Sequence, residues 1–322
     1  MRFVAILLLA ALGCSGCRGS QAEPSGAKQA TGQKDGAPDR GGTSQEHAEP
    51  KAPRCHAGWP MPNLAESGLP NPQGYDTSNP EVVLDRVTGL SWQRVVDPNI
   101  YSLPHAGDYC RDLTLAGHHD WRLPSIIELV SIADTSREDP AADPTAFPNT
   151  PSMWFWSSQT DITNTGLGWY LSFKNGGAYG GNDTKRLARA RCVRGHPSCT
   201  DDAEPYSVSG DSVHDSHSGL TWERAVEHDN YSWQDANAFC SHLTTHGGGW
   251  RLPSIRELLT VVDVTRFDPA IDTSVFPNTP SELFWSSSPS RSPAGTAWGV
   301  NFTRGSSGAA SVGTKAHVRC VR

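Results

Sequence analysis

The chain has 322 residues, with 27 basic and 34 acidic side chains and a formal net charge of −7 at pH 7. This length predicts about two domains. The acidic balance argues against a general nucleic-acid-binding protein, which needs an excess of Lys and Arg to displace counterions from phosphates. No stretch of the sequence approaches the ~20 apolar residues that a spanning helix requires.

Residues 1–17 are predicted to be an export signal. Arg2 precedes an apolar run at 3–12 and then small residues, a pattern typical of a secretory signal. The end of this segment resembles a bacterial lipobox, in which a Cys receives a diacylglycerol group. Cys17 and Cys14 are both candidates for lipidation, and Cys17 follows the better pair of small residues. The alternative is an ordinary cleaved signal with two incidental cysteines.

Residues 18–54 are predicted to be a disordered linker. They contain no Val, Ile, Leu, Met, Phe, Tyr or Trp, so they cannot bury enough apolar surface to offset their conformational entropy. Because a lipid would hold the preceding segment on a membrane, we expect the linker to separate a folded module from that membrane. The expected location is the outer membrane or cell surface, facing the periplasm or the exterior.

The remaining chain contains two copies of one sequence unit. Residues 121–158 and 250–287 align at a constant offset of 129, with 24 of 38 positions identical. Further repeated segments flank them: Asp85–Arg94 and Asp215–Arg224, then Arg191–Arg194 and Arg319–Arg322. A period this long is not that of a solenoid. The sequence therefore predicts two tandem domains, at about 75–195 and 200–322.

Each copy has the same predicted elements in chain order. A short strand at 89–92 or 219–222 precedes a helix that Ser102 or Ser232 caps. A second helix follows each Trp-Arg-Leu-Pro motif, because Ser125 with Glu128, and Ser254 with Glu257, have the spacing of a capping box. Strands with alternating apolar residues follow, among them those ending at Phe173 and Phe302. Early helices and late strands predict an α+β fold, with two helices and a small, mostly antiparallel sheet per domain.

The cysteines agree with export, because an even number in an exported chain suggests disulfides. Cys110 and Cys192 occupy the same places in the first copy as Cys240 and Cys320 in the second. The simplest pairing therefore joins the first helix to the last strand within each copy. Cys55 and Cys199 precede the two copies, and they either pair with each other or remain free or intermolecular thiols.

The repeated motifs resemble those of one known family. The order Thr-Gly-Leu-x-Trp-Gln-Arg, a helical Cys, Trp-Arg-Leu-Pro-Ser, Phe-Pro, Trp-Ser-Ser and Arg-Cys-Val-Arg resembles the Lcl C-terminal domain family, formerly a domain of unknown function. The resemblance covers about 75–195 and 205–322. It implies two C-type-lectin-like domains in an exported bacterial protein, and binding of glycans or other surface polymers. The collagen-like repeat of the adhesin that named the family is absent from this sequence.

Charge separates the two copies. Residues 81–198 carry 11 basic and 13 acidic side chains, and residues 199–322 carry 9 and 14. The basic residues of the first copy concentrate near its end, so an anionic polymer is expected to prefer this copy. The candidate ligand-binding residues are Lys174, Lys185, Arg186, Arg189 and the tryptophan Trp154. The alternative is a solvated charged surface.

The aromatic and other motif residues have a more ordinary interpretation. The tryptophans that recur in both copies are predicted to be core, whereas Trp154 and Trp59 lack a counterpart and are the better candidates for exposure. Arg122 and Arg251 are expected to bond loop carbonyls or to pair with a carboxylate.

Metal binding and catalysis have weak signals. Asp134, Asp139 and Asp143 lie on one loop and are candidate calcium ligands, because calcium prefers carboxylate oxygens. Their spacing fits no EF-hand, and no other cofactor is expected. A thiol enzyme, as in the related fold of formylglycine-generating enzymes, would need a Cys outside the disulfides.

The sequence thus favours a non-catalytic, lipid-anchored binding or adhesion protein that contacts a glycan or an envelope or surface protein, and no nucleic acid. The alternatives are a structural or assembly lipoprotein of the envelope, and an enzyme on this fold.

Overall fold

The computed structural model describes residues 59–196, 205–224, 226, 229–244 and 247–322. Both copies belong to one compact unit, Pro50–Arg322. The described residues contain no helix that is long and apolar enough to cross a membrane. Several predictions fall outside the described residues: the signal with Cys14 and Cys17, the linker at 18–54, and the cysteines Cys55 and Cys199.

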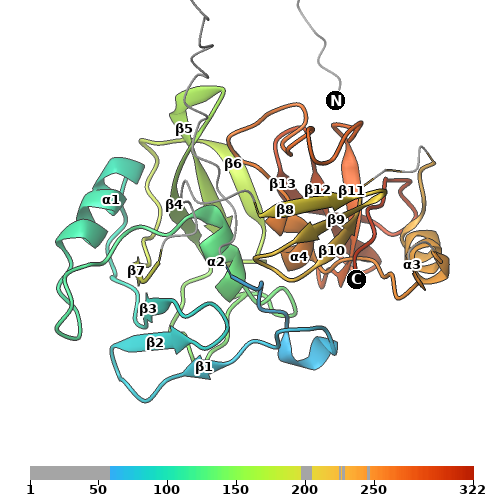
Figure 1. Cartoon of the computed structure of the whole chain (residues 1–322). Helices are drawn as coiled ribbons and strands as arrows, with labels where there is room; N and C mark the ends of the chain where they lie inside the picture. Colours follow the sequence, from blue (N-terminus) through green and yellow to red (C-terminus); the bar gives the residue numbers. More distant parts are fainter. Residues whose placement is uncertain (1–58, 197–204, 225, 227–228, 245–246) are drawn as a thin grey trace, which may run out of the picture. The chain divides into compact units, whose positions relative to one another are not determined.

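The first copy contains two antiparallel sheets and two helices (Figure 1). One sheet has the order β1-β2-β3-β7, and the other has the order β4-β5-β6. The strands are β1 (Tyr75–Asp76), β2 (Val82–Asp85), β3 (Ser91–Gln93), β4 (Trp154–Asp161), β5 (Asn164–Ser172), β6 (Ala178–Asp183) and β7 (Val193–Arg194). The helices are α1 (Leu103–Asp112) and α2 (Ile126–Ile132), and a 3-10 turn, η1 (Ala65–Ser67), precedes them.

The second copy repeats this arrangement. Its sheets have the orders β10-β9-β8 and β11-β12-β13. The strands are β8 (Tyr206–Ser209), β9 (Ser212–Asp215), β10 (Thr221–Glu223), β11 (Leu283–Pro289), β12 (Thr296–Asn301) and β13 (Ser306–Ser311), and the helices are α3 (Trp233–His242) and α4 (Ile255–Thr260). The predicted α+β class, tandem copies and mostly antiparallel sheets are confirmed.

Helix starts follow the sequence signals with one exception. Both predicted capping boxes are present, at Ser125 with Glu128 and at Ser254 with Glu257. Ser232 caps α3 by accepting a hydrogen bond from the Asp235 backbone N–H. Ser102 stands at the N-cap of α1 but makes no side-chain cap bond. Its hydroxyl lies 3.0 Å from His105 Nδ1 instead.

Each β4-β5-β6-type sheet is covered on both faces. On one face of the first copy, Trp156 and the α1 residue Leu103 belong to one buried cluster. On the other face, Phe155 and Trp169 belong to a larger core. The eight recurring tryptophans are all buried, which confirms their prediction as core: Trp92, Trp121, Trp156, Trp169, Trp222, Trp250, Trp285 and Trp298. The prediction that Trp59 is exposed is wrong, because it packs into the larger core.

The larger core contains residues of both copies, which therefore share one interior. Ala178 and Ser307, equivalent positions at an offset of 129, meet across the boundary: the Ala178 N–H donates to Ser307 Oγ at 2.8 Å. Arg304 of the second copy pairs with Asp161 of the first at 2.9 Å. Contact between equivalent positions is the arrangement expected of a symmetric dimer interface, here built within one chain.

The segment before the first copy packs against the second copy. Asn63 Nδ2 donates to Glu257 Oε1 at 3.1 Å, and Ser254 Oγ donates to Asn63 Oδ1 at 2.7 Å. Arg256, at the position of Ile127 in the first copy, is buried there and donates to the carbonyl oxygens of Pro62 and Ala133. Residues 59–73 therefore tie the start of one copy to a helix of the other.

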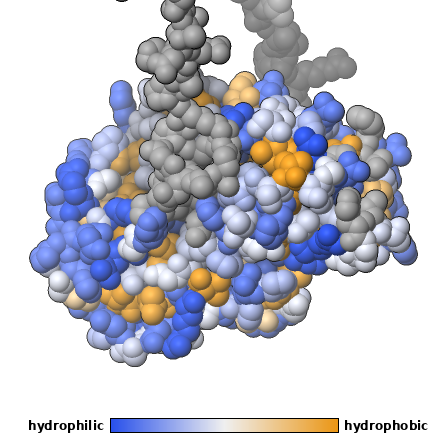
Figure 2. All heavy atoms as spheres, viewed as in Figure 1, coloured by the Kyte–Doolittle hydropathy of each residue, from blue (hydrophilic) through white to orange (hydrophobic). Residues whose placement is uncertain are grey.

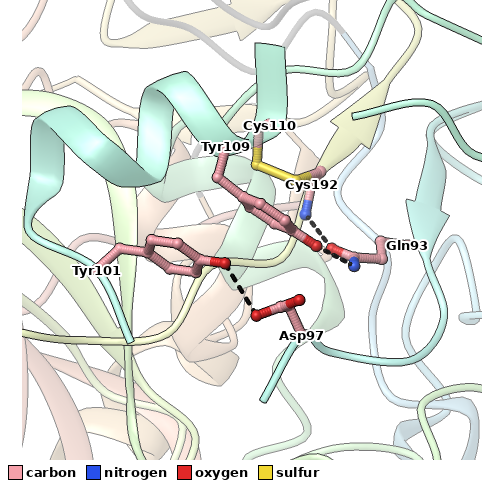
Figure 3. Close-up of a disulfide and its surroundings, with 6 residues drawn as sticks. All are labelled: Gln93, Asp97, Tyr101, Tyr109, Cys110 and Cys192. Carbon is pink, nitrogen blue, oxygen red and sulfur yellow. Dashed lines mark hydrogen bonds between the residues drawn. A yellow bond between two sulfur atoms is a disulfide. The ribbon is translucent and has the colours of Figure 1, made fainter. Parts of the chain in front are cut away.

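The two predicted intracopy disulfides are present, Cys110–Cys192 and Cys240–Cys320. Figure 3 shows the first, beside which the Tyr109 hydroxyl accepts a hydrogen bond from Gln93 Nε2 at 2.8 Å. Gln93 Oε1 in turn accepts from the Cys192 backbone N–H at 3.1 Å. Each bridge joins the first helix of a copy to the segment that precedes its C-terminal end.

Two arginines of the Arg-Cys-Val-Arg motifs are completely buried. Arg191 lies over the ring of Phe147 with 4.6 Å between guanidinium carbon and ring centroid, and burial lowers its pKa to about 9. Arg319 lies 4.7 Å over Phe276, and burial lowers its pKa to about 10. Arg191, although it lies among the basic residues near the end of the first copy, is therefore part of the interior and adds no charge to the surface.

The hydrogen bonds of these two arginines differ, which predicts different costs of replacement. Arg319 donates to the carbonyls of Glu223 and Arg224 and to Thr279 Oγ1. Arg191 donates to Thr150 Oγ1, while its Nε and Nη1 have no partner among the described residues. Removing a donor leaves buried acceptors unsatisfied, at about 1–3 kcal/mol. We expect Arg319→Met to lower the free energy of unfolding by about 2 kcal/mol more than Arg191→Met.

Urea unfolding of both variants against the unmodified chain measures this difference. Equal losses of unfolding free energy in the two variants would contradict the explanation from hydrogen bonding. They would indicate that both arginines stabilise the protein mainly through their contacts with aromatic rings.

Candidate functional site

The arginine of each Trp-Arg-Leu-Pro motif has a structural role, because it binds the glutamate of the following capping box. Arg122 makes two hydrogen bonds to the Glu128 carboxylate, at 2.7 and 2.6 Å, and Arg251 makes two to Glu257, at 2.7 and 2.8 Å. The same carboxylates accept from the N-cap backbone of their helices. This confirms the predicted pairing with a carboxylate and accounts for both residues within the fold.

The predicted basic surface of the first copy is only partly assembled. Arg189 donates to the carbonyl oxygens of Asp97, Pro98 and Asn99, which occupy one of its terminal nitrogens. Lys174, Lys185 and Arg186 are exposed and form no ion pair within the described part of the chain. Lys174 follows β5, whereas Lys185 and Arg186 follow β6. The structure therefore leaves a smaller set of available cations than the sequence predicts.

The basic residues at the matching end of the second copy are engaged. Arg304 pairs with Asp161, and Lys315 pairs with Asp235 at 3.1 Å. Arg319 is buried, as described above. At this end of the fold, the second copy therefore offers fewer cations without a carboxylate partner than the first.

Trp154 and Arg186 meet at the surface of the first copy. The Arg186 guanidinium carbon lies 5.8 Å from the centroid of the Trp154 ring, within the range of a cation–π contact. Trp154 is 39 % exposed, as its lack of a counterpart in the second copy predicts. Two of the candidate ligand residues thus form one amphipathic surface feature.

Two tyrosines extend this feature across the sheet. The ring centroids of Trp154 and Tyr170 are 5.0 Å apart, and those of Tyr170 and Tyr179 are 5.5 Å apart. Both tyrosines are half-buried. The three rings come from β4, β5 and β6, and we call them, with Arg186 at their end, the aromatic row. Apolar patches on the face drawn in Figure 2 are small and lie among hydrophilic surface.

The second copy pairs the equivalent strands but lacks the aromatic row. Tyr170 pairs with Tyr179 across β5 and β6, and Gly299 pairs with Gly308 across β12 and β13. Leu283 stands in place of Trp154. The alignment of the copies could have revealed the tyrosines, because two aromatic residues oppose two glycines at the constant offset.

The acidic loop does not assemble a metal site in the described residues, where no three His, Cys, Asp or Glu side chains group as metal ligands. Asp134 accepts from Arg137 Nε at 2.9 Å and from Ser136. Asp143 accepts from the backbone N–H groups of Thr145 and Ala146 and so closes a turn. Asp139 is exposed. The sequence pattern here reflects turn formation.

A cleft of about 1370 Å³ lies between segment 63–73, loop 134–144 and the start of α4. Its lining includes serines at 287, 288 and 290 and carboxylates on both sides. Arg256 reaches into its wall, where its donors already serve the carbonyls of Pro62 and Ala133. The cleft is thus bordered by the leading segment and by parts of both copies.

The four cysteines in the described chain are all in disulfides. Comparison with curated proteins finds no match. Among known families, the Lcl C-terminal domain matches the chain twice, over residues 81–194 and 211–322. These two matches cover most of the chain and coincide with the two copies of the fold. The chain belongs to the Lcl C-terminal domain family, of which it carries two tandem members.

Proposed function

We propose that this chain is a non-catalytic binding protein, exported and held by a lipid on the outer membrane or cell surface, that recognises a glycan or other surface polymer. The observation that carries the proposal is the contact between Arg186 and Trp154 on the first copy. An exposed ring beside an available cation offers both an apolar face and a charge to a polymer with acidic groups.

The structural roles of the motif arginines and of two carboxylates of the acidic loop support this proposal. The motif arginines hold helix caps or lie in the core, and carboxylates of the acidic loop close turns. Lys185 and Arg186 remain exposed on the first copy, which the sequence charges predict to be the preferred site for an anionic polymer. A polyanion would gain from both, because each contact releases counterions.

Retention of the whole chain on immobilised heparin, measured over a range of salt concentrations, tests the proposal. Lys185→Ala with Arg186→Ala is expected to elute at lower salt and to reduce the slope of log affinity against log salt by about two. The control is Arg291→Ala with Lys315→Ala, which removes two exposed cations from the second copy.

Equal losses in both double variants would overturn the assignment to the first copy. If the whole chain were retained neither on heparin nor on uncharged polysaccharides, the proposed binding function would be overturned. A structural role in the envelope would then be favoured.

A further inference from the structure

We infer that the cleft between the leading segment and the two copies binds an extended peptide through the positively charged side chains of that peptide. The residues that line the cleft include none of Lys174, Lys185, Arg186 and Trp154. This second site therefore goes beyond the proposed function and does not depend on it.

The boundary between the copies has two equivalent sides, and only one of them is open. Three residues that line the cleft have counterparts, at an offset of 129, that line an apolar cavity of only about 20 Å³ on the other side. The pairs of counterparts are Ile255 and Ile126, Arg256 and Ile127, and Ser288 and Gln159. Packing therefore fills one side of the boundary, while the other side keeps about 1370 Å³ of open space.

An ion pair and an aromatic ring bridge the copies on the closed side. Arg304 of the second copy donates to Asp161 of the first at 2.9 Å, and its guanidinium carbon lies 5.3 Å from the ring centroid of Phe267. The residues that replace Asp161, Arg304 and Phe267 on the cleft side are Ser290, Asn175 and Glu138, respectively. Because neither the ion pair nor the ring is available there, the differences between the copies keep this side open.

The carboxylates of the cleft lack cations. Glu66, Glu138 and Asp143 line the cleft and form no ion pair within the part of the chain that the structure describes. In the second copy, by contrast, the counterpart of Asp143 is Asp272, which pairs with Arg266 at 3.4 Å. The cleft thus presents negative charge that the equivalent loop of the other copy neutralises.

The cations that line the cleft offset little of this charge. Arg137 pairs with Asp134 at 2.9 Å, and the donors of Arg256 serve carbonyl oxygens. Arg291 remains, exposed at the rim. Glu138 and Asp143 are half-buried, and partial burial strengthens their attraction for a cation because the effective dielectric constant is lower than in water. The cleft therefore favours a positively charged ligand.

The volume and the polar wall favour a peptide over a small cation. Clefts for small molecules measure about 300–1,000 Å³, and this cleft exceeds that range. Its carboxylates lie both on the leading segment, at Glu66, and on loop 134–144, so they can hold basic side chains at two places along one peptide. Ser287 and Ser290 line the cleft, and hydroxyls both donate to and accept from peptide groups.

Fluorescence anisotropy of a labelled hexalysine peptide, titrated with the whole chain at low salt, tests the inference. Glu66→Gln with Glu138→Gln is expected to weaken binding about tenfold, because each substitution removes one attractive charge. Spermine, which carries amines without peptide groups, should compete at least tenfold more weakly than unlabelled peptide. Thermal unfolding checks that each variant is folded.

Two further variants separate the cleft from the general acidity of the chain. The control is Glu81→Gln with Asp211→Asn, which removes two exposed carboxylates from equivalent positions outside the cleft and should leave binding unchanged. Asn175→Arg with Ser290→Asp copies the Arg304–Asp161 pair of the closed side. This variant keeps the net charge but is expected to weaken binding about tenfold, because the new ion pair narrows the cleft.

Equal weakening in the glutamate variant and in its control would mean that the peptide binds the acidic surface in general, and would overturn the inference. The same conclusion would follow if hexalysine did not bind, or if Asn175→Arg with Ser290→Asp bound it normally. Competition by spermine as strong as that by the peptide would overturn the assignment of a peptide ligand. The proposed function is tested separately through Lys185 and Arg186, so it stands in each of these cases.

Discussion

Replacing both Cys110 and Cys192 by Ser is expected to lower the free energy of unfolding by about 4 kcal/mol. The bridge closes a loop with a sequence separation of 82, and for such a loop the chain-entropy model gives about 4.5 kcal/mol. Both residues are fully buried beside Trp156 and α1. Their loss therefore also loosens the contact between α1 and the sheet below it.

Guanidinium unfolding of the double-serine variant and the unmodified chain, both without reductant, measures this effect. The second copy supplies a matched comparison, because Cys240 and Cys320 have a separation of 80. Replacement of that pair should cost nearly the same. A loss below about 1 kcal/mol for either pair would contradict the view that the bridges chiefly restrict the unfolded chain.

The features that sequence predicts well here depend on local chemistry or on the repeat. A capping box needs only a Ser and a Glu three residues apart, and both boxes are present at Ser125 and Ser254. The disulfide pairing followed from equivalent positions in two copies. Burial of the recurring tryptophans followed from the same argument, since equivalent positions in two copies of one fold are expected to be buried alike.

Features that depend on tertiary contacts could not be predicted from the sequence. In the sequence, Arg191 resembles the other basic residues near the end of the first copy. In the structure, it lies among phenylalanine rings. Trp59 lacks a counterpart, as Trp154 does, but only Trp154 is exposed. The aromatic row needs the register of three strands, which brings Tyr170 opposite Tyr179. Neither propensity nor spacing along the chain contains that register.

The sequence also treated the copies as separate domains in tandem, while the structure adds a shared interior and a leading segment that bridges them. One substitution between the copies carries much of this connection. Arg256 replaces Ile127, and its guanidinium bonds residues of the leading segment and of the first copy from within the second. The alignment displays the change, but only the folded chain reveals its partners.

Arg256→Ile, which restores the residue of the first copy, is therefore expected to lower the free energy of unfolding by about 3 kcal/mol. The guanidinium donates to the carbonyls of Ala133 and Pro62 and to Gln73 Oε1, at 3.0, 2.8 and 3.0 Å. Each buried acceptor left without a donor costs about 1–3 kcal/mol, and relief of the desolvation of the charge offsets part of the sum.

Urea unfolding followed by tryptophan fluorescence measures the loss. The matched control is Arg291→Ile, at the rim of the same cleft, where an exposed arginine without an ion pair in the described chain should cost less than about 0.5 kcal/mol. Because Arg256 joins three segments, its loss should also release residues 59–73 to proteolysis before the copies unfold. An unchanged midpoint and unchanged protection of that segment would mean that the shared apolar core alone holds the two copies and the leading segment together.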